Sequence, residues 1–151
     1  MDNKLLRLLI DRALSLRDDA VKVAVQAGRE RDAAAQTLRT LTEYRDESIT
    51  RGPLREGQQS NTEQLRIAGQ FDARLITAIR QQSGQHAAKE QLVQSRQGQV
   101  TQAQQRLKAF ETIAQRQAQR NQLKQTRREQ RLLDEYASDL STRQRTRDTS
   151  R

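Results

Sequence analysis

Apolar residues recur every three or four positions through the first fifty residues of the chain. Such a repeat is typical of a coiled-coil seam, the row through which one helix packs on another, and it predicts a helix from about residue 4 to residue 50. Ten of the thirteen predicted seam positions are apolar and several are alanine, so close helix approach is expected. These positions are Leu6, Leu9, Ala13, Leu16, Ala20, Val23, Ala27, Glu30, Ala34, Thr37, Leu41, Tyr44 and Ser48.

A second helical pattern extends from about residue 62 to residue 140. Residues 60–63 supply good N-cap side chains and an acid in the first turn, which favour a helix start there. The apolar row is weaker in its middle, where polar residues occupy seam positions and Gly69, Gly84 and Gly98 lower the local helix propensity. The predicted seam positions are Leu65, Ala68, Asp72, Leu75, Ile79, Gln82, His86, Lys89, Val93, Arg96, Val100, Ala103, Leu107, Phe110 and Ala114.

The two patterns are separated by a turn over residues 51–61, which contains Pro53, the only proline of the chain. Proline and its neighbouring glycines stop a helix, so the expected fold is all-α, a two-helix antiparallel coiled-coil hairpin. At 1.5 Å per residue the helices would be roughly 70 Å and 115 Å long, and the second would overhang at the C-terminus. Residues 1–151 are expected to form a single coiled-coil domain, with a basic tail over 141–151 for which disorder stays open.

Composition supports an extended helical protein rather than a globular one. Hydrophobic residues make up 33% of the chain, charged residues 31% and aromatic residues 3%, which is too little bulk to fill a three-dimensional core. There is no cysteine and no apolar run long enough to cross a bilayer, so a cytoplasmic protein is expected. The net charge of +9 lies beyond Thr50, because residues 1–50 hold nine basic and nine acidic side chains. This basic surplus favours an anionic partner.

No motif in the sequence supports an enzyme. The chain has no phosphate-binding loop of the Gly-x-x-x-x-Gly-Lys-Ser/Thr type, and its single histidine, His86, has no cysteine or second histidine nearby to complete a metal site. Adjacent acids such as Asp18 and Asp19 would diverge on a helix rather than converge. We therefore expect no catalytic residue, no metal and no cofactor.

Near the turn the sequence has more apolar residues than one seam requires. Phe71, Leu75, Ala78 and Gln82 share one helical face at spacings of i, i+4, i+7 and i+11. An apolar face in excess of the seam is suited to docking a partner, although the same residues could belong to the core if the register differs.

Three motifs together resemble one known family. They are Leu38-x-x-Leu41-x-x-Tyr44 before the turn, Gln70-Phe71-x-x-x-Leu75-x-x-Ala78-Ile79 after it, and Arg127-Arg128-Glu129-Gln130-x-x-x-Asp134-Glu135-x-Ala137 near the end. In order and spacing over about residues 5–140 the chain resembles the FliJ family, flagellar export proteins that act as the central stalk of the export ATPase.

The resemblance implies a stalk that inserts into the hexameric ring of the flagellar export ATPase and promotes its assembly. It also implies contact with the cytoplasmic domain of the membrane export gate, binding of export chaperones, and a cytoplasmic location associated with the inner membrane at the flagellar base. The gate-binding candidates are Leu41, Tyr44, Phe71, Leu75, Ala78 and Gln82. The ring-binding candidates at the basic end are Arg116, Arg120, Lys124, Arg127, Arg128 and Arg131.

Two other functions remain open at this point. A stalk of a virulence type III secretion system would have the same shape and role. A basic coiled coil could also bind nucleic acid, but the basic run lacks aromatic residues for stacking on bases, and acids interrupt it. Nucleic acid is therefore not the expected partner.

We expect the isolated protein to be an elongated, strongly helical monomer, because an antiparallel hairpin satisfies its own seam without a second chain. Small-angle scattering should give the profile of a rod, and circular dichroism a helical spectrum. A compact sphere or a coil-like spectrum would contradict this fold.

Overall fold

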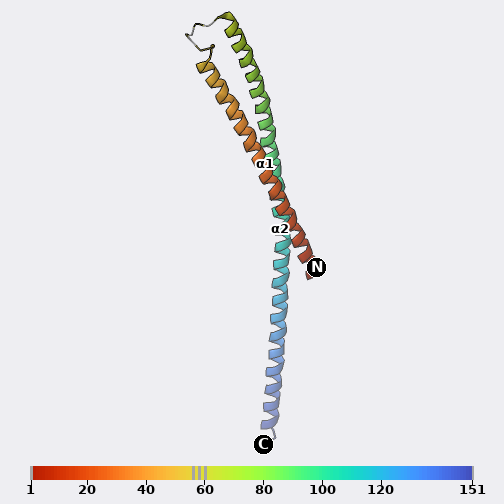
Figure 1. Ribbon diagram of the computed structural model, residues 1–151. Coiled ribbons are helices and arrows are strands. Elements are labelled where there is room, and N and C mark those ends of the chain that lie inside the picture. The colour runs from red at the N-terminus through yellow and green to blue at the C-terminus, as the bar shows by residue number, and fades with distance from the viewer. Residues whose placement is uncertain (1, 56, 58, 60, 151) are drawn as a thin grey trace. The chain divides into compact units, whose positions relative to one another are not determined.

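The protein consists of two long helices joined by a loop. The structure is a computed structural model that describes residues 2–55, 57, 59 and 61–150. Helix α1 spans Asn3–Arg51 and helix α2 spans Thr62–Asp148, and the described part of the chain contains no strand (Figure 1). The expected all-α fold with a longer second helix is confirmed. Helix α2 continues to Asp148, past its expected end near residue 140, so most of the basic tail is helical.

Helix α1 ends where the sequence predicts. The Gly52 N–H donates a hydrogen bond of 3.0 Å to the Ser48 carbonyl, which closes the last turn of the helix. A side chain at Gly52 would collide with that same carbonyl oxygen, so the close approach requires glycine. Further along the loop, Gly57 has a φ of 82°, a conformation that glycine adopts at little cost. The end of α1 and the course of the following loop therefore depend on the steric requirements of Gly52 and Gly57.

Helix α2 begins with a side-chain cap. The Gln64 N–H donates a hydrogen bond of 2.8 Å to the Asn61 Oδ1 atom, which satisfies one of the free donors of the first turn. The first turn also contains Glu63, as expected. Of the other predicted capping residues, Ser60 lies outside the described residues.

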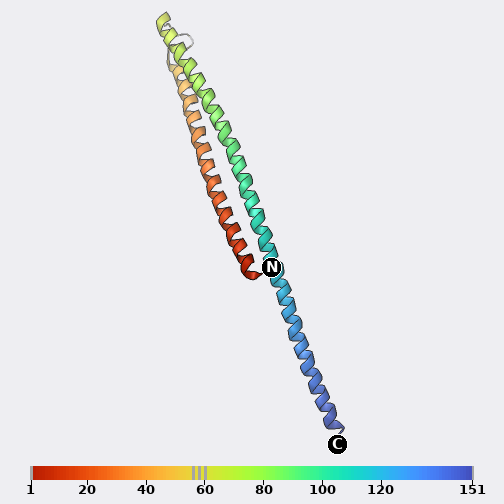
Figure 2. The same ribbon diagram turned by 90° about the vertical axis from the view of Figure 1, so that its right-hand side faces the viewer.

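The described chain divides into two compact units. We call residues 13–105 the turn unit, and the described residues of 1–12 and 106–151 the terminal unit. In the turn unit the two helices run side by side in opposite directions from the loop (Figures 1 and 2). In the terminal unit the Gln117 side chain donates a hydrogen bond of 2.9 Å to Asn3, so the start of α1 contacts α2 there. Each unit thus contains part of both helices.

The predicted seam of α2 is confirmed along nearly its whole length. Every predicted position from Ala68 to Ala114 is buried or half-buried, whereas Leu65, the first position, is 41% exposed. The most buried side chains of α2 are Leu75, Val93 and Leu107. The 3.5-residue repeat therefore gave the correct face of this helix.

The predicted seam of α1 is correct at nine of its thirteen positions and wrong at four. The seven positions spaced by seven residues from Leu6 to Ser48 are buried or half-buried, as expected. Between them, Leu9 and Glu30 are half-buried as expected. The other four predicted positions are exposed and the next residue along the chain is half-buried instead; they are Leu16, Val23, Thr37 and Tyr44. The half-buried residues directly after these intervening positions are Ile10, Arg17, Ala24, Arg31, Leu38 and Arg45.

Arginine occupies the seam of α1 because its side chain has an apolar stem and a charged end. Arg45 shows how the charge is satisfied: its Nε atom lies 2.8 Å from Oδ1 of Asp72 on α2, and the hydrogen bond raises the pKa of Arg45. Arg31 lies 4.0 Å from Glu90 of α2. A hydrophobicity pattern favours Leu16 over Arg17, so it selects the wrong neighbour.

A second ion pair between the helices joins Lys89 to Glu30. The lysine Nζ atom lies 3.0 Å from the Glu30 Oε2 atom, and both side chains are 41% exposed. Hydrogen bonding from Lys89, and then from Gln26, lowers the pKa of Glu30. A depressed carboxyl pKa stabilises the fold at pH values above its unfolded pKa, and this contribution is lost as the pH falls through the folded pKa.

We therefore expect Lys89→Met to lower the urea midpoint at pH 7 and to have a smaller effect at pH 3, because protonation of Glu30 in acid removes the charge that pairs with Lys89. Lys22→Met is the matched control, because Lys22 is an exposed lysine of the same unit with no carboxylate partner among the described residues. Denaturation at the two pH values measures the difference. Equal losses at both pH values would contradict the ion pair.

Candidate docking surfaces

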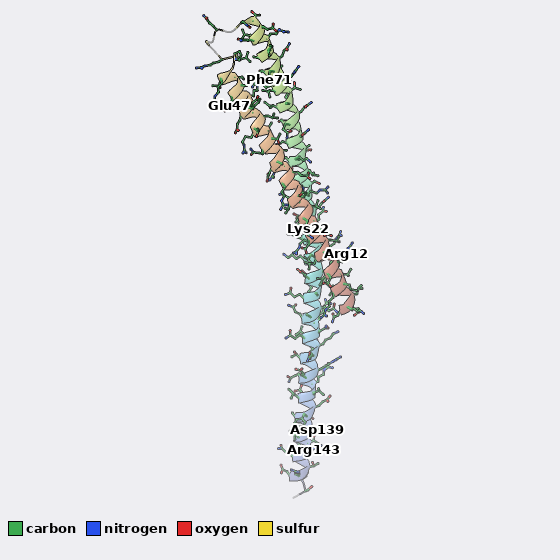
Figure 3. All side chains as sticks on the ribbon, in the orientation of Figure 1. Arg12, Lys22, Glu47, Phe71, Asp139 and Arg143 are labelled. Carbon is green, nitrogen blue, oxygen red and sulfur yellow. The ribbon has the colours of Figure 1, made fainter. Side chains whose placement is uncertain are left out.

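An exposed pair of aromatic rings lies near the loop. Tyr44 of α1 and Phe71 of α2 meet edge to face, with ring centroids 6.1 Å apart and an angle of 83° between the planes. Tyr44 is 54% exposed and Phe71 is 39% exposed (Figure 3 labels Phe71). Aromatic rings held in this way present a rigid apolar surface to a partner at little entropic cost.

Leu75 does not belong to this exposed surface, although the sequence placed it in the same row as Phe71. It is only 8% exposed and lies in the seam of α2. The expectation that Leu75 is accessible is wrong. The reason is geometric: residues four apart on a helix differ by about 40° in direction, which is enough to move a side chain from the rim of a two-helix seam to its centre.

The remaining gate-binding candidates are half-buried. Leu41, Ala78 and Gln82 all line the contact between the helices in the turn unit. The Gln82 side-chain amide donates a hydrogen bond of 3.2 Å to the carbonyl oxygen of Ala34, so its polar group is already engaged by α1. Of the six candidates, Tyr44 and Phe71 offer the most accessible side chains.

A groove beside Phe71 extends the aromatic pair toward the loop. It has a volume of about 540 Å³, and Ile67, Ala68 and Phe71 are among its lining residues, with Arg51. Ile67 is 57% exposed and was not among the sequence candidates. Its position four residues before Phe71 could have identified it as a member of this surface, because residues at i and i+4 share a helix face.

The second candidate surface is a row of cations on α2 in the terminal unit. All six ring-binding candidates are exposed, and none of them forms an ion pair with a described residue. Arg116, Arg120 and Lys124 follow one another at intervals of four residues and line a shallow groove of about 410 Å³. Because these charges have no ion-pair partner among the residues that the structure describes, they are available to an anionic surface.

Exposed apolar residues share this part of α2. Every described residue from 118 to 150 is exposed, and Figure 2 shows the corresponding blue part of α2 without a neighbouring helix. Side chains such as the labelled Asp139 and Arg143 project from it to solvent (Figure 3). The large apolar side chains exposed here are Leu123, Leu132, Leu133, Tyr136 and Leu140. Exposed apolar surface of this extent on a helix is typical of a site that binds a partner.

No group of three or more potential metal ligands comes together among the described residues. His86 lies 3.8 Å from Glu90 on the same helix and contributes to a surface ion pair if protonated. Over the described residues, neither helix has an apolar stretch that could cross a bilayer.

The chain matches a known protein family in a comparison with family models. The model described as flagellar FliJ protein matches residues 3–146. No curated protein sequence and no solved structure matches the chain. The matched range includes all of α1, nearly all of α2 and both candidate surfaces.

Two single substitutions distinguish the contribution of the aromatic pair to stability from that of the seam. We expect Leu75→Ala to destabilise the protein by about 2–5 kcal/mol, because it removes a buried side chain and leaves a cavity. Phe71→Ala should cost only about 1 kcal/mol, because it removes a half-exposed ring and its contact with Tyr44. Thermal or urea unfolding measures both. Equal losses would mean that Phe71 is also part of the core.

Proposed function

The chain belongs to the flagellar FliJ family, whose members take part in flagellar type III protein export, and on that basis we propose that it is the non-enzymatic stalk of the export apparatus. In this role it inserts into the ring of the export ATPase, promotes assembly and activity of the ring, and contacts the export gate. The observation that carries the proposal is the unpartnered end of α2, where every described residue from 118 to 150 is exposed.

The end of α2 supports insertion into a ring. Leu132, Leu133 and Tyr136 are each more than 60% exposed, at 65%, 63% and 66%, and burial of such side chains is a strong driving force for association. The six ring-binding candidates add positive charge on the same part of the helix. Loops of a ring that carry acidic groups would attract these charges and tolerate small changes of register.

The aromatic pair supports a separate contact with the export gate. Tyr44 and Phe71 are presented by two helices that hold them edge to face. A rigid, partly exposed aromatic pair has the features of a binding hot spot. Because Phe71→Ala should leave the fold largely intact, loss of gate binding in that variant would report a lost contact.

The proposal includes export chaperones as further partners and a cytoplasmic location, with peripheral association at the inner membrane of the flagellar base. The protein has no catalytic part in this scheme; hydrolysis belongs to the ATPase. An equivalent stalk in a virulence secretion system is the alternative, and the family match favours the flagellar system.

We expect reversal of Arg127, Arg128 and Arg131 to glutamate to abolish stimulation of the export ATPase. A single exposed charge contributes little to binding, whereas three reversals replace attraction to the ring by repulsion. The binding that remains should also be less sensitive to salt. Steady-state ATP hydrolysis and salt-dependent binding measure the two effects.

The matched control reverses Arg29, Arg39 and Arg80, which are exposed arginines of the turn unit, so the net charge changes equally. This control should stimulate the ATPase normally. Full stimulation by the Arg127, Arg128 and Arg131 variant would rule out the basic row as the ring contact. Loss of tight, salt-sensitive RNA or DNA binding in that variant would favour a nucleic-acid function instead.

A further inference from the structure

The seam of α2 is more polar in the middle of the turn unit than on either side: its half-buried residues there are Gln82, His86, Lys89 and Glu90. We call residues 28–35 of α1 and residues 82–90 of α2 the polar section. None of its described residues is buried. On the side away from the loop, the nearest buried residues are Ala27 and Val93, each 4% exposed. On the side of the loop, the nearest is Leu75. The two helices therefore lack a dry core over this stretch.

Polar contacts join the helices in the polar section instead. The Gln82 amide donates to the Ala34 carbonyl at 3.2 Å, and Lys89 pairs with Glu30 at 3.0 Å. A further pair, Arg31 to Glu90, is long at 4.0 Å. The charged side chains in these pairs remain 31–45% exposed, so water screens them and exchanges with them readily.

Each helix also carries a glycine within the polar section, Gly28 in α1 and Gly84 in α2. A Cβ atom added at either position would meet nothing within 4 Å, so packing does not require glycine there. Neither has a positive φ, so the backbone does not require glycine either. What glycine does at both positions is to weaken the helix, because it has more backbone freedom than alanine.

We propose that the polar section is a flexible joint, at which α1 and α2 bend and separate while the apolar layers on both sides stay packed. Screened pairs, polar seam residues and two glycines all lower the free energy of local opening at the same place. The role of the joint rests on the proposed stalk function: it would let the loop with its aromatic pair move during export without the flanking seams coming apart.

Hydrogen exchange on the isolated full chain tests the joint without any partner. We expect amides of residues 28–35 and 82–90 to be protected at least about tenfold less than those of residues 13–27 and 93–105, after correction for intrinsic exchange rates. Equal protection along the turn unit would overturn the joint, whatever the protein does to an ATPase.

A matched pair of double variants tests its role. Gly28→Ala with Gly84→Ala stiffens the joint, and Gly69→Ala with Gly98→Ala makes the same change at two other helical glycines of the turn unit with open space around them. Both doubles should raise the Tm by roughly 2–8 °C. Only the first should raise protection in the polar section about tenfold and lower flagellar protein export at least about threefold, with ATPase stimulation unchanged.

The outcomes separate the joint from the stalk function. If the two double variants have the same pattern of amide protection and the same level of export, the proposed joint is overturned. If the first double is rigidified but exports normally, its role in export is overturned. If the unmodified protein does not stimulate the ATPase, the stalk function fails, whereas low protection of the polar section still supports the joint.

Discussion

Two helices that pack only on each other can bury just one narrow row of side chains apiece, and this limit governs the whole molecule. The side chains that are nearly inaccessible are Leu6, Ala13, Ala27, Leu75, Val93 and Leu107, all in the seams. With so little buried surface at each level, stability must accumulate along the length of the helices. It also follows that most of each helix surface is free, so a coiled-coil hairpin can devote its outer faces to partners.

The sequence predicted the helices, the loop and the seam of α2, because these depend on strong local signals: proline and glycine at one place, and a long repeat elsewhere. It failed at four positions of the α1 seam, Leu16, Val23, Thr37 and Tyr44. There, Leu16 and Arg17 are neighbours, and a pattern of apolar residues cannot foresee that the arginine stem lies in the seam. The sequence pattern assigns Leu75 both to the α2 seam and to the exposed row of Phe71, and only the seam assignment is correct. The partners of the exposed surfaces lie beyond sequence and fold alike.

Arginine has two distinct roles in this protein. Arg45 and Arg31 sit in the seam and reach acids of α2, so they help to fix the pairing of the helices. Arg120, Arg127 and Arg131 lie on an exposed helix without an ion-pair partner among the described residues, so their charge is directed outward. The amino-acid composition does not distinguish these two groups of arginines. Only their position relative to the seam distinguishes charge that stabilises the fold from charge that is available for recognition.

The exposed end of α2 has a consequence for the abundance of the protein. A helix without tertiary contacts unfolds locally with ease, and proteases cleave chains at such openings. Residues 118–150 combine this property with frequent arginine and exposed leucine. A partner that covered this stretch would also shield it from cleavage, so we expect the free chain to be shorter-lived than the bound one. Copies without a partner would then be removed first.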